Sequence, residues 1–153
     1  MRWMKKLTSI SLCAALITGS AVFASADAKD TYVSMGADLT VEQRAKVLEL
    51  MDLTEDDLAD MDVVQITNEK EHEMLGGYLP NSVIGSRALS CVRVDKKKSD
   101  GIQVTTKNIT YCTEGMYQNA LITAGIENAD VIVAGPTNIS GTAGLVGAKL
   151  IRN

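Results

Sequence analysis

The chain has 153 residues, with 15 basic and 19 acidic side chains and a formal net charge of −4. That length is enough for one domain with one hydrophobic core. The acidic balance argues against nucleic acid and anionic lipid as partners, because both carry dense negative charge.

The first 26 residues have the pattern of a secretory signal peptide. Three basic residues within positions 1–6 precede an apolar run over 7–23, and a small-residue tripeptide that ends at Ala26 fits a cleavage site. The run is shorter than the ~20 residues of a spanning helix. We therefore expect cleavage after Ala26 and a secreted, extracytoplasmic chain of residues 27–153 that forms a single domain without a transmembrane segment. Its net charge would be −7, since residues 1–26 contain three basic and no acidic side chains.

Cap residues and apolar spacing predict the elements of the first half. Thr40 and Gln43 form a capping box at the start of a helix, and Thr54 caps a second helical turn. The elements expected there are a leader with an extended piece at 32–35, a helix over 40–51, a turn of helix from Thr54, a strand over 63–67 and a helix over 69–75 capped by Asn68.

The second half begins with two alternating segments, residues 87–95 and 102–110, that are joined by the charged turn KKKSDG. Alternation on both sides of a polar turn predicts a β-hairpin. The elements expected after it are a helix over 114–124 capped by Thr113 and ended by Gly125, a strand over 130–134 and a helix from Ser140 to Ile151. Glycine and alanine at 141, 143, 144, 147 and 148 would let the last helix lie close to a neighbour.

The order from residue 63 to 134 is therefore strand, helix, strand, strand, helix, strand. This is the ferredoxin-like split βαβ arrangement (βαββαβ) of an α+β fold. A right-handed crossover would place its first and last strands side by side, with the hairpin on the far side. The extra N-terminal and C-terminal helices would add to this unit, and a three-layer α/β sheet is the alternative.

Two cysteines remain after cleavage, Cys91 and Cys112, and an oxidising compartment permits a disulfide. In the predicted hairpin Cys91 lies opposite Thr105, which is seven residues, or roughly 23 Å, from Cys112. A disulfide needs Cα atoms within about 7 Å. We therefore expect no disulfide and two free thiols.

No metal site, cofactor or catalytic residue is predicted. The acidic cluster at 52–62 fails the calcium-loop pattern, because Asp57 stands where glycine is needed and Val63 where glutamate is needed. His72, the single histidine, has charged neighbours and no HExxH or cysteine pair beside it. Both groups are expected to be solvated helix surfaces.

The candidate ligand-binding residues are Ser140, Gly141, Thr142, Arg87 and Tyr78. The first three open a helix whose N–H groups could bind phosphate or the carboxylate of a cell-wall peptide; an ordinary N-cap with close packing is the alternative.

Arg87 could pair with a ligand carboxylate or with Glu114, as a structural ion pair. Tyr78 follows two glycines, and its ring could bind sugar or peptide or cap the core. Tyr117 and Asn119 are expected at the surface.

Five segments, LTVEQRAKVLEL, EHEMLGGYLP, IGSRALS, NITYCTEGMYQNALITAGI and PTNISGTAGLVG, occur in this order between about residues 33 and 147. Together they resemble a secreted bacterial family known as domain of unknown function 1002 (DUF1002). The resemblance implies a secreted protein, found mainly in Gram-positive bacteria, with no established activity. It also implies that related chains carry further helical sequence at the C-terminus, so that this chain is expected to be a truncated member.

Three functions are compatible with these patterns. The first is a non-catalytic module that binds a cell-envelope protein or peptidoglycan. The alternative is an envelope-acting hydrolase that uses Ser140 or Thr142, although the chain has no GxSxG elbow and His72 is its one imidazole. The third is an assembly subunit whose open sheet edge pairs with a partner strand.

Overall fold

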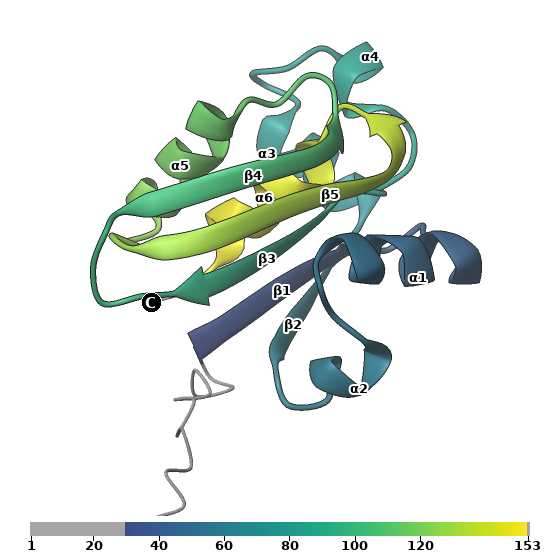
Figure 1. Cartoon of the computed structure of the whole chain (residues 1–153). Coiled ribbons are helices and arrows are strands. Elements are labelled where there is room, and N and C mark those ends of the chain that lie inside the picture. The colour runs from purple at the N-terminus through teal and green to yellow at the C-terminus, as the bar shows by residue number, and fades with distance from the viewer. Residues whose placement is uncertain (1–29, 153) are drawn as a thin grey trace, which may run out of the picture.

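The computed structural model describes residues 30–152, which form five strands and six helices (Figure 1). The expected signal peptide lies outside the described residues. The elements are β1 (Thr31–Gly36), α1 (Val41–Leu50), α2 (Glu55–Leu58), β2 (Asp62–Ile66), α3 (Asn68–Leu75), α4 (Asn81–Ile84), β3 (Cys91–Lys96), β4 (Ile102–Ile109), α5 (Glu114–Thr123), β5 (Ala129–Ile139) and α6 (Thr142–Leu150). No helix within residues 30–152 is both long enough and apolar enough to cross a membrane.

The five strands form one open mixed sheet in the order β2-β1-β3-β5-β4. β1 runs parallel to β2, and β4 runs parallel to β5. β3 joins these two pairs and is antiparallel to both of its neighbours, β1 and β5. The predicted α+β class is confirmed.

The predicted hairpin is wrong, because β5 lies between β3 and β4. Val131 and Val133 are buried on one face of β5, and Ala134 is buried on the other. A strand that is covered on both faces reads as a nearly continuous apolar run and belongs in the interior of a sheet. β4 alternates between exposed and half-buried residues, as an edge strand does.

The predicted neighbourhood of the first and last strands is also wrong. Residues 32–35, taken as part of a leader, lie in β1, which is buried along its whole length between β2 and β3. β1 therefore separates β2 from the rest of the sheet, and the strand order is not the ferredoxin-like one.

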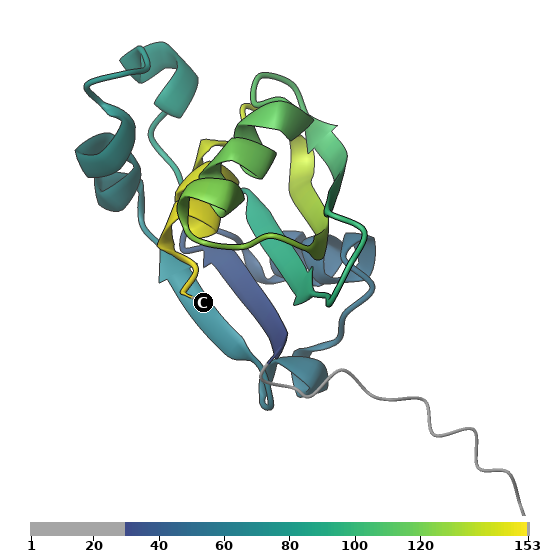
Figure 2. The same cartoon turned by 90° about the vertical axis from the view of Figure 1, so that its left-hand side faces the viewer.

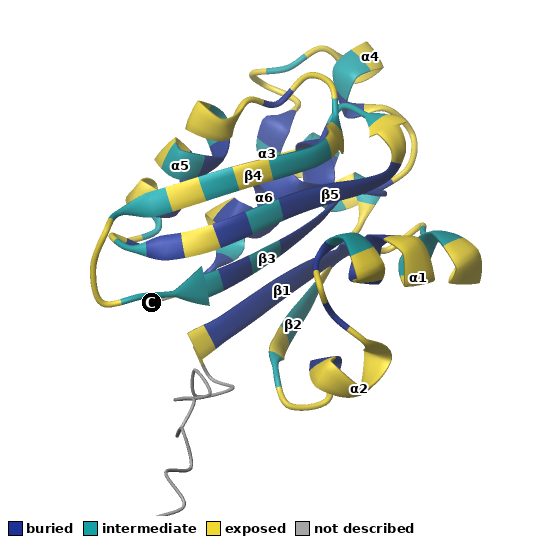
Figure 3. Cartoon of the chain, in the orientation of Figure 1, coloured by how far each residue is buried: buried dark blue, intermediate teal, exposed yellow. Residues whose placement is uncertain are grey.

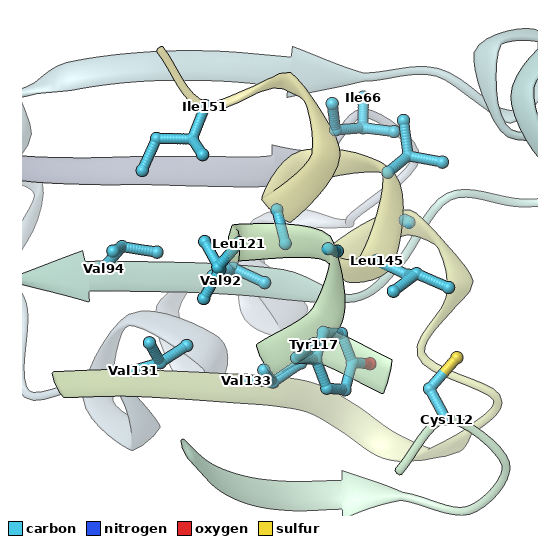
Figure 4. Packing of buried hydrophobic residues seen from close by; sticks show 14 of the residues in the cluster. Ile66, Val92, Val94, Cys112, Tyr117, Leu121, Val131, Val133, Leu145 and Ile151 are labelled. Carbon is cyan, nitrogen blue, oxygen red and sulfur yellow. The ribbon is translucent and has the colours of Figure 1, made fainter. Parts of the chain in front are cut away.

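Helices cover both faces of the sheet, as in the three-layer alternative (Figures 1 and 2). α1 and α2 enclose one core with β1, in which Met35, Val47 and Met51 are fully buried. α3, α5 and α6 enclose the larger core on the opposite face, around Tyr117 and Leu121 (Figure 4). β1 is buried along its length, whereas α1 and the edge strand β4 carry exposed positions (Figure 3).

The close approach expected of the last helix is confirmed at Gly144 and Gly147. A Cβ on Gly144 would come within 3.0 Å of Val92, and one on Gly147 would overlap Ser34 of β1. The Tyr32 hydroxyl donates to the Gly147 carbonyl at 2.8 Å, which ties α6 to β1. The small residues therefore let α6 lie directly on the sheet.

Most predicted helix starts agree with the structure. Thr40, Thr54 and Thr113 are N-caps with capping boxes. The prediction was one residue late at α3, where Thr67 is the cap. It was wrong at α6, where Gly141 precedes the helix, and it missed α4.

Cys91 and Cys112 are both free and buried. The register used to separate them does not exist, since β3 and β4 are unpaired. Burial raises the pKa of Cys91 to about 12 and the pKa of Cys112 to about 11.

Candidate functional site

The candidate site lies where β5 passes into α6. Gly141 joins them in a left-handed conformation (φ 92°), which a residue with a side chain rarely adopts. The buried Tyr117 hydroxyl donates to the Gly141 carbonyl at 2.7 Å. A Cβ at position 141 would overlap that hydroxyl and lie 2.6 Å from Ile109. Glycine is therefore required here by both the backbone and the neighbours.

Tyr117 was expected at the surface but is completely buried. Its position on α5 directs the ring into the core beside Val133 (Figure 4). Burial raises the pKa of its hydroxyl far above the ordinary value, so this group stays protonated and donates. It positions the start of α6.

Glu71 is the main feature that sequence reasoning missed. It was included in a solvated helix surface, yet its side chain is 1% exposed. Its carboxylate accepts from the Thr142 hydroxyl at 2.6 Å and from the Asn68 amide at 2.9 Å. Burial raises the pKa of Glu71, and these two hydrogen bonds oppose the rise. The sequence signal was its place one helical turn before the buried Leu75 on the same face of α3.

The same helix holds the chain between α4 and β3. The Gly85 carbonyl accepts from the Asn68 side chain at 3.1 Å and lies 2.9 Å from His72 Nε2. His72 thus contacts a turn of the backbone rather than Ser140 or Thr142 in the part of the chain that the structure describes. No group of three or more histidine, cysteine or acidic residues within residues 30–152 could hold a metal ion.

A cavity of about 260 Å³, the α6 cavity, lies between α3, α4 with the turn after it, and the junction of β5 with α6. Four of the five predicted ligand-binding residues line it: Arg87, Ser140, Gly141 and Thr142. The other lining residues are Glu71, Ser82, Val83, Ile84, Gly85, Ser86, Leu89, Ser90 and Ile139. The hydroxyls of Ser82 and Ser86 were not predicted, because α4 and the turn after it were read as an undivided loop.

Hydroxyl and backbone groups at the start of α6 are partly engaged with the protein itself. Ser90 accepts from the Gly144 N–H at 2.7 Å, and the hydroxyls of Ser140 and Thr142 lie 3.3 Å apart. Thr142 is 2% exposed, whereas Ser140 is half-buried. Ser140 is therefore the more accessible of the two hydroxyls.

Arg87 is exposed at the rim of the α6 cavity. The structural ion pair expected with Glu114 does not occur within residues 30–152, where the four salt bridges involve other residues. Within the described part of the chain the rim thus carries a cation without an ion pair, while the cavity wall carries the buried carboxylate of Glu71.

Tyr78 does not join this group. Its ring is 83% exposed and lines a separate apolar hollow of about 400 Å³ between α3, α5 and α6. The predicted residues therefore divide between two surfaces.

Comparison with known proteins gives a family but no activity. The family model described as "Protein of unknown function (DUF1002)" matches residues 35–149. An uncharacterized protein of Bacillus subtilis (strain 168), YpuA, is 41% identical over 148 residues, which covers 94% of this chain and 50% of YpuA. The chain thus spans about half the length of this curated relative, and no solved structure matches it. By the match over most of its length, the chain belongs to the DUF1002 family.

Proposed function

We propose that the domain is a non-catalytic extracytoplasmic module that binds a peptide with a free carboxylate, from a cell-envelope protein or from peptidoglycan, in the α6 cavity. The signal-like pattern of residues 1–26 supports export. The observation that carries the proposal is the convergence of Arg87, Ser140, Gly141 and Thr142 on one cavity.

The charges around the cavity support a peptide end over a simple anion. Arg87 at the rim can hold a carboxylate through two parallel hydrogen bonds. Glu71 is buried in the wall, and its negative charge favours a ligand that presents a donor, such as an amide N–H, on that side of the cavity. The serine hydroxyls can bond the peptide groups between these two ends.

The test is calorimetric titration with short envelope-type peptides, each made with a free carboxylate and with a C-terminal amide. Arg87→Ala should weaken binding of the free acid about tenfold, the low end for a charge-assisted hydrogen bond because the site is exposed. Arg152→Ala, at an exposed arginine that does not line the cavity, is the matched control. Equal binding of acid and amide, or of wild type and Arg87→Ala, would refute the proposal.

One observation favours the hydrolase alternative. Ser140, Thr142 and Glu71 form a chain of hydroxyl, hydroxyl and carboxyl groups, and a buried carboxyl with a raised pKa resembles a general base. Against it, Thr142 is buried, and His72 contacts the Gly85 carbonyl instead of these three groups. Hydrolysis of envelope peptides by wild type that is lost in Ser140→Ala would support an enzyme; equal rates in both would remove this alternative.

A further inference from the structure

A second surface, distinct from the α6 cavity, lies on the helical layer. This hollow of about 400 Å³, the helical groove, has walls from α5 and from the turn after α3 and a floor from α6. Leu79 and Met116 line the walls, and Leu145 lies in the floor. The lining is largely apolar, whereas the chain as a whole is acidic.

The shape of the groove suits a helix. Met116 and Ala120 of α5 and Ala124, the C-cap of that helix, follow one another at four-residue spacing, and all three line the groove. Such a row is one of the ridges through which helices interlock, and small residues in it leave room for the ridge of a neighbour. The row extends over roughly 12 Å at the helical rise of 1.5 Å per residue, which matches about two turns of a partner helix.

The charge of the groove limits the partner. Lys149 is the single charged residue that lines it, and its ammonium has no ion pair or hydrogen bond within residues 30–152. Tyr78 lies at the rim with 83% of its surface exposed, and exposed tyrosine is enriched where proteins bind one another.

We propose that the helical groove binds an amphipathic helix of a partner protein. The apolar stripe of that helix lies along Met116, Ala120 and Ala124 and covers Leu145. An acidic residue beside the stripe pairs with Lys149. The interaction is independent of the α6 cavity, which is lined by different residues.

The probe is a helical 16-residue peptide with leucine on one face and glutamate on its flanks. Two matched peptides serve as controls, one with lysine in place of each glutamate and one with the same composition in shuffled order. Binding is measured by calorimetry and by amide chemical shifts. The glutamate peptide should bind and shift groove residues, and the shuffled peptide should not.

Charge and shape are tested separately by two pairs of variants. Lys149→Glu should weaken binding of the glutamate peptide by about fivefold or more and strengthen binding of the lysine peptide. Lys98→Glu, in an exposed turn, should leave the affinity for both peptides unchanged. Thr123→Trp should fill the groove and abolish binding, while Ile122→Trp, 60% exposed on the same helix but outside the groove, should not.

The proposal is overturned if the glutamate peptide does not bind at about 1 mM, if the shuffled peptide binds equally, or if Lys149→Glu leaves the preference unchanged. Binding of laurate, a single-chain anionic amphiphile, in the groove with no binding of the peptide would also overturn it. None of these experiments changes Arg87 or the α6 cavity, so their outcomes do not test the proposed function of that cavity.

Discussion

Replacing Gly141 with alanine tests how the start of α6 is positioned. Gly141 has φ 92°, and an added Cβ would overlap the Tyr117 hydroxyl and lie 2.6 Å from Ile109 Cγ2. The variant therefore combines backbone strain with a collision against a buried group. Because Tyr117 is held in the core, it cannot move aside freely.

The expected cost follows from these two contributions. A non-glycine residue in a left-handed conformation costs about 1–2 kcal/mol, and overpacking a well-packed site costs about 1–3 kcal/mol. Gly141→Ala should therefore lower the free energy of unfolding by about 2–5 kcal/mol, a large part of the 5–15 kcal/mol typical of a domain.

The assay is urea unfolding followed by circular dichroism, with Gly101→Ala as control. Gly101 also has positive φ (70°), but an added Cβ would meet nothing within 4 Å, so this variant measures backbone strain alone. The double variant Gly141→Ala with Tyr117→Phe lacks the collision with the hydroxyl. Its loss of unfolding free energy should therefore be smaller than the sum of the losses in the two single variants. A cost for Gly141→Ala no greater than that for Gly101→Ala would show that the overlap with Tyr117 does not destabilise the fold.

Three further predictions concern the buried polar groups. Tyr117→Phe should cost about 1 kcal/mol in urea unfolding, because Gly141 keeps its helical bond from Leu145; an unchanged midpoint would contradict this. Since the pKa of Glu71 is raised in the folded state, its contribution to stability is fully present at low pH and is lost as the pH rises through the folded pKa. Wild type should therefore lose unfolding free energy relative to Glu71→Gln as the pH rises above the ordinary pKa range of glutamate. A difference between the two proteins that stays constant with pH, or that grows in favour of wild type, would contradict a raised pKa. Cys91 and Cys112, with raised pKa values, should be alkylated by iodoacetamide at pH 8 only after denaturation, as read by peptide mass spectrometry; rapid labelling of the native protein, or a bridged peptide, would contradict their burial as free thiols.

Local signals in the sequence predicted most of the helices, but they did not predict which strands pair. Thr40, Thr54 and Thr113 announce their helices because a cap acts on the N–H groups of the next three residues. Pairing depends on contacts between distant segments, and adjacent strands in sequence often pair, which favoured the hairpin. The apolar run of β5 was the available signal that this strand lies inside the sheet.

The candidate site was predictable in part for the same reason. Ser140, Gly141 and Thr142 are adjacent in the chain, so one recognised turn places all three. Arg87 lines the same cavity, although the strand predicted to begin at residue 87 begins at Cys91. Glu71 was missed because burial of a carboxylate depends on a partner, Thr142, that is 71 residues away.

The most direct test of the proposed binding function is a two-dimensional NMR titration of the protein with an acetylated dipeptide that has a free carboxylate. Binding in the α6 cavity should cause saturable shifts of the amides of Arg87, Ser140 and Gly141, and Arg87→Ala should abolish these shifts while the rest of the spectrum stays unchanged. Shifts confined to other surfaces, or none at saturating peptide, would contradict it.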